Sequence, residues 1–288
     1  MASNGVIFTE LNTCMKWNDK YIPENQLIYV RDGTTSCDGG FLVHHFLNSF
    51  INHGKKVTLC SFNQSFFHYN TVELKLNINL EKESQEGKFT FIDAQQSFVD
   101  SSVETGDDLL LFSSPLLITK TTPATRPTCI VNLKHNNSLD EYLANLFEIL
   151  TCEKQQSSCI ILDHVNPLLQ YYFDQDVNRK LLKFITKLKK FYSNNISIIV
   201  LMHNHPADDE NTQLTNMFEH MSDIVYRVGP LPTGYSKDVH GKVECISYIN
   251  DGTLASSKKA SLHFKTFESK VSLFAPGSVS ASHDTFLF

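Results

Sequence analysis

The fold is decided by residues 26–50, which read QLIYVRDGTTSCDGGFLVHHFLNSF. The stretch begins with an apolar strand over 26–31, which the turn signal Asp32-Gly33 closes. A glycine-containing loop follows, and the apolar residues over 41–50 keep helical spacing. This spacing leaves four polar residues on the other side of the helix: His44, His45, Asn48 and Ser49. A phosphate-binding loop would lie in a unit of this kind, because glycines let backbone N–H groups converge at the start of a helix.

The rest of the chain alternates short β-branched strands with amphipathic helices, which is typical of a mostly parallel sheet between helices. Further strands are predicted at 55–62, 89–93, 158–163, 196–202 and 224–228. A helix is predicted from Ser138, which forms a capping box with Glu141, and a long basic helix over 176–192. Another helix follows the acidic run that starts at 208, and it gathers four apolar residues on one face: Leu214, Met217, Phe218 and Met221. Residues 95–137 mix strand and loop signals.

The C-terminal part changes to hairpin-like strands. Strand-like runs at 242–249, 262–267 and 271–274 are separated by turns, and Asn250-Asp251-Gly252 carries a strong hairpin signal. An α/β core with antiparallel strands at its C-terminal edge is the RecA-like architecture, although this spacing also fits other doubly wound folds. We expect a single domain over residues 1–276 and a loose Ser-rich tail over 277–288.

Composition limits the range of functions. The chain has 25 Lys and Arg against 31 Asp and Glu, and this net charge of -6 argues against a generally basic nucleic-acid-binding surface. The seven cysteines include no CxxC pair, which favours reduced thiols over a disulfide framework. No window approaches the roughly 20 apolar residues of a membrane span, and the N-terminus does not resemble a signal peptide. We therefore expect a soluble cytoplasmic protein that makes no membrane contact, with the nucleus as a second location.

The loop after the first strand fails the test for a working phosphate loop. A Walker loop needs G-x-x-x-x-G-K-[ST], in which the lysine neutralises the phosphates and the hydroxyl binds magnesium. Here five residues separate Gly33 from Gly39, Gly40-Phe41 stands in place of the lysine and hydroxyl, and Asp38 adds negative charge. We favour a structural turn over a nucleotide cradle.

Two other positions resemble catalytic sites without the usual partner residues. Asp163 ends an apolar strand, as a magnesium-binding Walker B aspartate would, but a carboxylate there often caps the next helix, which we favour. The run His203-Asn204-His205-Pro206 resembles the core of metal-dependent deubiquitinases, yet Leu214 and Met217 stand where that family has a serine and an aspartate. We interpret its histidines as a turn-forming, solvent-facing pair. We expect no catalytic residue, no cofactor and no metal ligand.

One predicted helix carries a basic stripe opposite its apolar residues. Five cations recur there at helical spacing and are the candidate RNA-facing residues: Arg179, Lys180, Lys183, Lys187 and Lys190. Such stripes are usually solvated faces, and contact with RNA or an acidic partner is the alternative. The chain has just four arginines, so base-specific readout, which depends on the bidentate arginine fork, is not expected.

Several segments closely resemble one known family. DGGFLVHHFL over 38–47, QSFFHY over 64–69 and TGYSKDVHG over 233–241 are similar to the sixth-subunit family of the Elongator complex. The resemblance implies a RecA-like, P-loop-type fold without Walker motifs. It also implies a hetero-hexameric ring with the fourth and fifth subunits, which joins subunits one to three. Such a ring binds transfer RNA (tRNA) and supports modification of its wobble uridine.

The resemblance implies no catalytic residue, but it marks segments that are candidates for contact with ring neighbours. These candidate interface residues are Asp38, Gly39, Gly40, Phe41, His68, Tyr69, Asp238, Val239 and His240. The alternative is that they specify turns and core contacts. Two rival functions also stay open: a RecA-type ATPase whose degenerate loop over 33–40 cradles phosphates, and a stand-alone RNA-binding module that uses the lysine helix.

Overall fold

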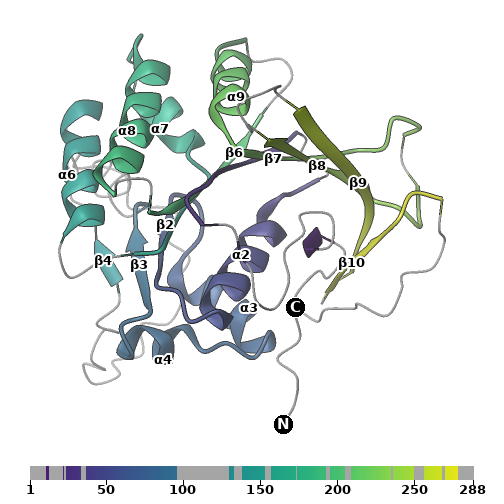
Figure 1. The fold of residues 1–288 in the computed structure, drawn as a ribbon, viewed down its shortest axis with the longest axis horizontal. Coiled ribbons are helices and arrows are strands. Elements are labelled where there is room, and N and C mark those ends of the chain that lie inside the picture. Colours follow the sequence, from purple (N-terminus) through teal and green to yellow (C-terminus); the bar gives the residue numbers. More distant parts are fainter. Residues whose placement is uncertain are drawn as a thin grey trace, which may run out of the picture.

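All ten strands in the described part of the chain form one sheet, in the order β10-β9-β8-β7-β1-β6-β5-β2-β3-β4 (Figure 1). A computed structural model describes residues 11–12, 22, 24–33, 37–95, 130–132, 138–152, 157–172, 174–192, 195–204, 209–234, 236–249, 256–267 and 270–277. The strands are β1 (Leu27–Asp32), β2 (Val57–Ser61), β3 (Phe89–Asp93), β4 (Ile130–Asn132), β5 (Cys159–Asp163), β6 (Ser197–His203), β7 (Ile224–Gly229), β8 (Gly241–Ile249), β9 (Ser256–Phe267) and β10 (Lys270–Phe274).

The sheet is parallel from β7 to β4 and antiparallel from β7 to β10. Every neighbouring pair among β7, β1, β6, β5, β2, β3 and β4 is parallel. The pairs β7–β8, β8–β9 and β9–β10 are antiparallel. The expected architecture, a mostly parallel core with antiparallel C-terminal strands, is therefore confirmed.

Helices cover both faces of this sheet (Figure 1). On one face lie α2 (Gly40–Asn52), α3 (Phe66–Lys75) and α4 (Leu80–Gln85), and on the other lie α6 (Leu139–Thr151), α7 (Asn166–Tyr171), α8 (Val177–Phe191) and α9 (Asp209–Met221). The predicted cap of α6 is present, because the Ser138 hydroxyl accepts a hydrogen bond from the Glu141 amide at 3.3 Å. The sequence analysis did not assign α3, α4 or α7.

Strand β1 supplies side chains to both halves of the core, because successive residues of a strand point to opposite faces. Ile28 and Val30 pack in the layer that contains α2 and α3. Leu27 and Tyr29 pack in the layer of α6 to α9, where the Tyr29 ring stacks on Phe218 with centroids 5.3 Å apart. A central parallel strand with helices on both sides is apolar throughout for this reason.

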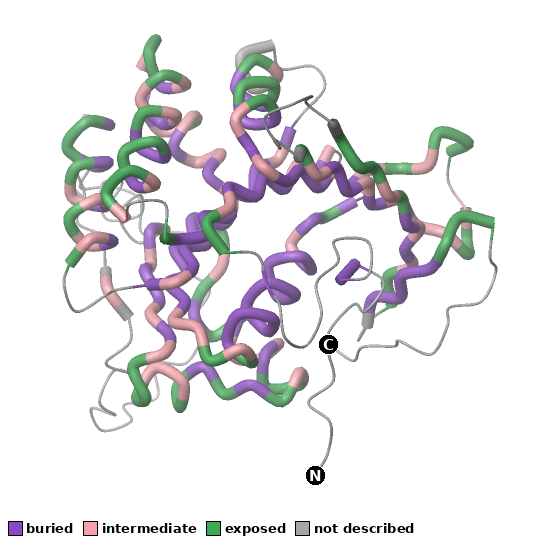
Figure 2. The backbone as a smooth tube through the Cα atoms, viewed as in Figure 1, coloured by how far each residue is buried: buried purple, intermediate pink, exposed green. Residues whose placement is uncertain are grey.

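The polar side of α2 is buried as well as its apolar side. His44, His45, Asn48 and Ser49 are all less than 8% exposed, so the helix does not divide into an inner and an outer face (Figure 2). The cause is that α3 and the antiparallel strands enclose α2 on the side away from the parallel strands. The His44 ring contacts Tyr69 of α3, and Phe41 contacts Phe264 of β9.

Two other expectations need correction. Met217 is 40% exposed, so it does not share the buried face of α9 with Leu214 and Phe218. Strand β9 begins at Ser256 and not near 262, because its polar start pairs with β8 and carries no apolar alternation to signal a strand. The predicted turn at 250–252, nearly all of the unassigned 95–137 segment and the tail beyond Gly277 lie outside the described residues.

Candidate functional site

The candidate site lies where the parallel strands end. Asp32 ends β1, Asp163 ends β5 and His203 ends β6, and the register pairs Asp32 with His203. Ligands of open α/β sheets bind outside the carboxyl ends of the strands, so this edge is the first place to look for a site. The loop after β1 leads from this edge into the N-terminus of α2.

Asp32 is the most buried polar group of the site, at 1% exposure. Its Oδ2 accepts a hydrogen bond from the Gly39 amide at 3.0 Å, and its Oδ1 lies 2.7 Å from Nδ1 of His203. His203 is itself fixed through its backbone, because Asn166 at the start of α7 bonds both its N–H and its carbonyl. Burial raises the pKa of the Asp32 carboxyl above its ordinary 3.8, although the Gly39 amide and His203 act in the opposite direction.

A second carboxylate occupies the start of α2. Oδ1 of Asp38 accepts a hydrogen bond from the Gly40 amide at 2.7 Å. The Gly39 and Gly40 N–H groups, which a phosphate would need, therefore already bind the chain's own carboxylates. Gly40 stands where a Walker lysine would be, and Phe41 stands where the hydroxyl residue would be. The Phe41 ring is buried, with its centroid 5.5 Å from that of Phe264. An incoming phosphate would meet negative charge here and no lysine.

Asp163 stands at the Walker B position but is held within the fold. The Tyr69 hydroxyl donates a hydrogen bond to Oδ2 of Asp163, and the hydroxyl of Ser61 lies 3.3 Å from that of Tyr69. Burial, followed by the Asp163 charge, raises the pKa of Tyr69 well above 10.0. The expectation that Asp163 caps the next helix is wrong, because the N-cap of α7 is Val165, which makes no side-chain cap.

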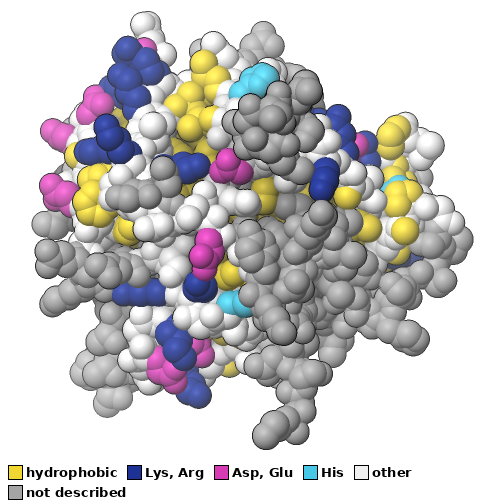
Figure 3. Space-filling view, viewed as in Figure 1, with side chains coloured by type: hydrophobic (Ala, Val, Ile, Leu, Met, Phe, Trp, Pro, Cys, Tyr) yellow, Lys and Arg dark blue, Asp and Glu magenta, His cyan; other side chains and the backbone are white. Residues whose placement is uncertain are grey.

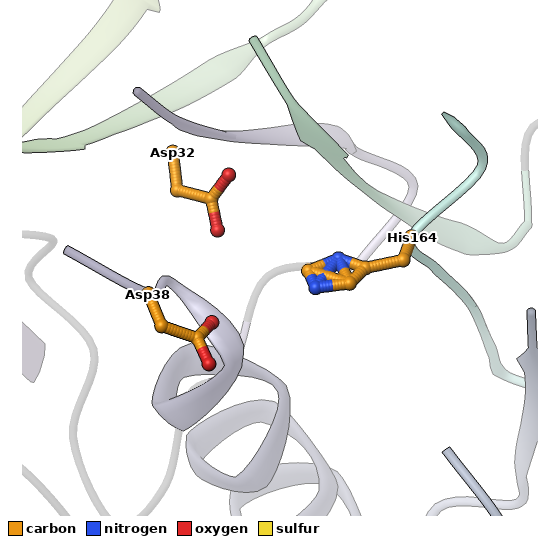
Figure 4. A group of neighbouring side chains, drawn as sticks. All are labelled: Asp32, Asp38 and His164. Carbon is orange, nitrogen blue, oxygen red and sulfur yellow. The ribbon is translucent and has the colours of Figure 1, made fainter. Parts of the chain in front are cut away.

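The interpretation of His203 as solvent-facing is also wrong in part, because its ring bonds to the buried Asp32. His205 lies outside the described residues. His164, which follows Asp163 with a positive φ of 55°, was not predicted as a site residue. Asp32, Asp38 and His164 face one another in Figure 4, and each offers a ligand atom within 4.8 Å of the others. Because ligands bind at the carboxyl ends of parallel strands, the residue that follows β5, His164, could have been predicted as a site residue.

Two of the candidate interface segments meet in space. The Cys37 thiol lies 3.5 Å from the carbonyl oxygen of His240, and the His240 amide donates to the carbonyl of Phe264 at 2.9 Å. Gly241 has no room for a side chain, since an added Cβ would lie 2.6 Å from Phe264 Cζ and 2.7 Å from the Gly229 carbonyl oxygen. The loop before α2 and the loop before β8 are therefore neighbours through Phe264.

The nine candidate interface residues divide by burial. Asp38, His68 and Asp238 are exposed, and Gly40, Val239 and His240 are half-buried. Gly39, Phe41 and Tyr69 are buried, in keeping with the alternative that these three specify the fold. A contact with a neighbouring subunit stays a prediction for all nine.

The basic stripe lies on α8, as predicted, but acidic residues stand beside it (Figure 3). Arg179 pairs with Asp176 at 2.6 Å, and Lys180 bonds both Asp140 and Asp174. Lys187 lies 3.9 Å from the centre of the Phe147 ring on α6. Lys183 and Lys190 are exposed and form no ion pair within the described part of the chain. Carboxylates thus partly neutralise the stripe, and its contact with RNA stays a prediction.

Solved structures identify the class of the fold. A KaiC-like protein of Pyrococcus horikoshii superposes with a TM-score of 0.53 at 12% identity, over 88% of this chain and 91% of that one. An uncharacterised protein of the same organism, solved in complex with an unknown peptide, superposes with a TM-score of 0.60 at 11% identity. This alignment covers 93% of this chain and 98% of that one. The chain thus has a RecA-like α/β fold.

The family follows from the sequence itself. The family model described as Elongation complex protein 6 matches residues 8–268, and the chain belongs to this family. Elongator complex protein 6 of Xenopus laevis is 25% identical over 277 residues, and that of Homo sapiens is 25% identical over 278. Both alignments cover 94% of this chain and 98% of the relative. The resemblance noted in the sequence is confirmed. Among the described residues, no helix combines the length and apolar character needed to cross a bilayer.

Proposed function

We propose that this chain is a non-catalytic subunit of the Elongator complex, which forms a hetero-hexameric RecA-like ring with the fourth and fifth subunits. The ring joins subunits one to three, binds tRNA and supports modification of the wobble uridine. The relatives are named Elongator complex protein 6, which supports membership of the complex. We expect the assembly in the cytoplasm and also in the nucleus, which a tagged chain followed by microscopy would test.

The observation that carries the non-catalytic role is the pair of carboxylates at the start of α2. Asp32 and Asp38 accept the Gly39 and Gly40 N–H groups at 3.0 and 2.7 Å. A nucleotide phosphate would have to displace them and would gain no lysine in return, because Gly40 and Phe41 stand where the Walker lysine and hydroxyl would be. This arrangement argues against the rival in which the chain alone is an ATPase.

Exposed apolar side chains support a subunit with two different contact faces. Phe67 and Leu74 on α3 are 77% and 49% exposed, and they lie seven residues apart on one side of the helix. Tyr248 of β8 and Phe267 of β9 are 43% and 44% exposed on other elements. A ring closed by head-to-tail contacts needs two unlike faces on each subunit.

The deciding experiment is native mass measurement of this chain after co-expression with its own fourth and fifth subunits. We expect a species that contains two copies of each subunit, and we expect Phe67→Glu and Phe267→Glu to weaken it. Thr186→Glu on the exposed side of α8 is the matched control and should leave assembly unchanged. A chain that stays alone at 32.7 kDa would overturn the proposal.

Transfer-RNA binding is tested separately, with and without the partners. Charge reversal at Lys183, Lys187 and Lys190 should weaken binding by the ring and flatten its salt dependence. The lone chain should bind weakly, because carboxylates hold Arg179 and Lys180. Strong, salt-dependent binding by the lone chain, lost on the same reversals, would favour the rival stand-alone RNA-binding module.

A further inference from the structure

We propose that Asp32, Asp38 and His164 form a binding site for one divalent transition-metal ion, for which Zn²⁺ is the best match. No metal ligand was expected from the sequence, in which His164 lies 126 positions beyond Asp38. The fold brings them together from the end of β1, the turn before α2 and the residue after β5 (Figure 4). The proposal does not depend on the assembly of a ring.

The geometry is close to that of a metal site. The three ligand atoms lie within 4.8 Å of one another, and the side chains converge in Figure 4. Ligand bonds of about 2 Å place the ligand atoms of tetrahedral Zn²⁺ roughly 3.3 Å apart. The difference requires a shift of about 1 Å at most in each side chain. Asp38 is exposed and lies in a turn, so it has the freedom to make that shift.

The charge of the site favours a cation. Within the described residues, neither Asp32 nor Asp38 forms an ion pair with a lysine or arginine. The positively charged group nearest to Asp32 would be the ring of His203, when protonated. Buried carboxylates are stable when they are paired or bind a metal, so a divalent ion would supply the missing charge.

Hydrogen bonds already orient the two carboxylates. His203 and the Gly39 amide bond Asp32, and the Gly40 amide bonds Asp38. Metal-binding carboxylates and imidazoles are oriented by hydrogen bonds of this kind in known sites. Nδ1 of His164 is buried and has no hydrogen-bond partner among the described residues, with the nearest Asp163 oxygen 3.9 Å away. The His164 imidazole therefore has a buried nitrogen that makes no hydrogen bond among the described residues.

The donor set also selects the kind of ion. One imidazole with two carboxylates suits Zn²⁺ or Mn²⁺, whereas Mg²⁺ prefers oxygen ligands and water. Three protein ligands leave at least one coordination position for water or for a group from a partner. The ion would lie beside the start of α2, where the exposed Asp38 connects the site to solvent.

The test is a calorimetric titration of the full chain with Zn²⁺ after removal of metals by a chelator. We expect one tight equivalent, and we expect Asp38→Asn and His164→Gln each to weaken it by about 100-fold or more. Asp176→Asn and His220→Gln, an exposed acidic residue beside α8 and an exposed histidine of α9, are the matched controls and should bind like the wild type. Mg²⁺ should not compete at equal concentration.

Thermal unfolding gives a second readout. Zn²⁺ should raise the Tm of the wild type and of both controls, because an ion that binds only the folded state stabilises it. It should not raise the Tm of Asp38→Asn, whose exposed side chain can be replaced without loss of folding. If His164→Gln fails to fold, Asp38→Asn alone decides. Absence of a stoichiometric site, or equal Zn²⁺ affinity in Asp38→Asn and the wild type, would overturn the proposal.

Discussion

Two carboxylate clusters flank β1, and they differ in how their charge is balanced. Glu219 of α9 bonds Arg227 through both oxygens, at 3.0 and 2.5 Å, and its Oε1 also accepts from Arg31 at 3.2 Å. One residue further along β1, Asp32 points to the opposite face, where His203 and the Gly39 amide bond it. The first cluster contains two arginines, whereas the described residues place no lysine or arginine in an ion pair with Asp32.

The pKa values follow this difference. Burial tends to raise the pKa of Glu219, but Arg227 and Arg31 overcome it and hold the pKa below 4.5. For Asp32 burial wins, and the pKa lies above 3.8. A cluster that neutralises itself stabilises the fold, whereas one that stays short of positive charge can take up a ligand. Four experiments test this difference between the two clusters.

The largest effect is expected for Glu219→Ala. Removal of this carboxylate leaves the half-buried Arg31 and Arg227 without their partner, which should cost roughly 2–3 kcal/mol of unfolding free energy. Urea unfolding measures the loss, with Glu148→Ala on the outer side of α6 as the control. A loss below about 0.5 kcal/mol would place the arginine cluster among ordinary surface ion pairs.

Asp32→Ala should cost less, about 1–2 kcal/mol, although Asp32 is the more buried residue. The Gly39 amide and His203 lose an acceptor, but the fold no longer buries an unbalanced carboxylate. The same urea experiment compares the two alanine variants directly. If Asp32→Ala loses more unfolding free energy than Glu219→Ala, the Asp32 cluster stabilises the fold more than the arginine cluster does, contrary to this expectation.

The loss of thermal stability at acid pH should depend on Glu219. Because its folded pKa lies below 4.5, its ion network stabilises the protein fully above pH 4.5 and loses that stabilisation as the pH falls through the folded pKa. Thermal unfolding between pH 6 and pH 3 should therefore fall more steeply for the wild type than for Glu219→Gln. Parallel curves would mean that Glu219 takes no part in the acid response.

The smallest effect on stability is expected for Asp38→Asn. Asp38 is exposed and bonds only the nearby Gly40 amide among the contacts described, so the free energy of unfolding should change by less than about 0.5 kcal/mol. The zinc titration of the same variant should nevertheless change strongly. A large loss of stability in the absence of metal would make Asp38 a structural residue and not a ligand.

The sequence predicted most of the fold because its strands are short apolar runs separated by clear helical periodicity. It predicted β1, α2 and α8 to within a few residues, and it predicted the start of α6. It missed the burial of His44 and His45, because helical periodicity records one buried face and not enclosure by α3 and β9. It missed α7, which is too short to show a period.

The candidate site was predicted only in its separate parts. The defective loop and the strand-end position of Asp163 were both visible in the sequence. The bond of Asp32 to His203, and the approach of His164, depend on strand order, which places β1 beside β6 and β6 beside β5. Residues 132 positions apart, such as Asp32 and His164, come together only through that order.

The chain's own carboxylates fill the phosphate position of this RecA-like fold, and calorimetric titration of the full chain with MgATP measures whether they exclude a nucleotide. We expect no saturable binding to the chain alone below about 1 mM, and we expect the same result for the Glu219→Gln variant. Saturable binding at micromolar concentration would contradict this claim, because the nucleotide phosphates would then occupy the amides assigned to Asp32 and Asp38.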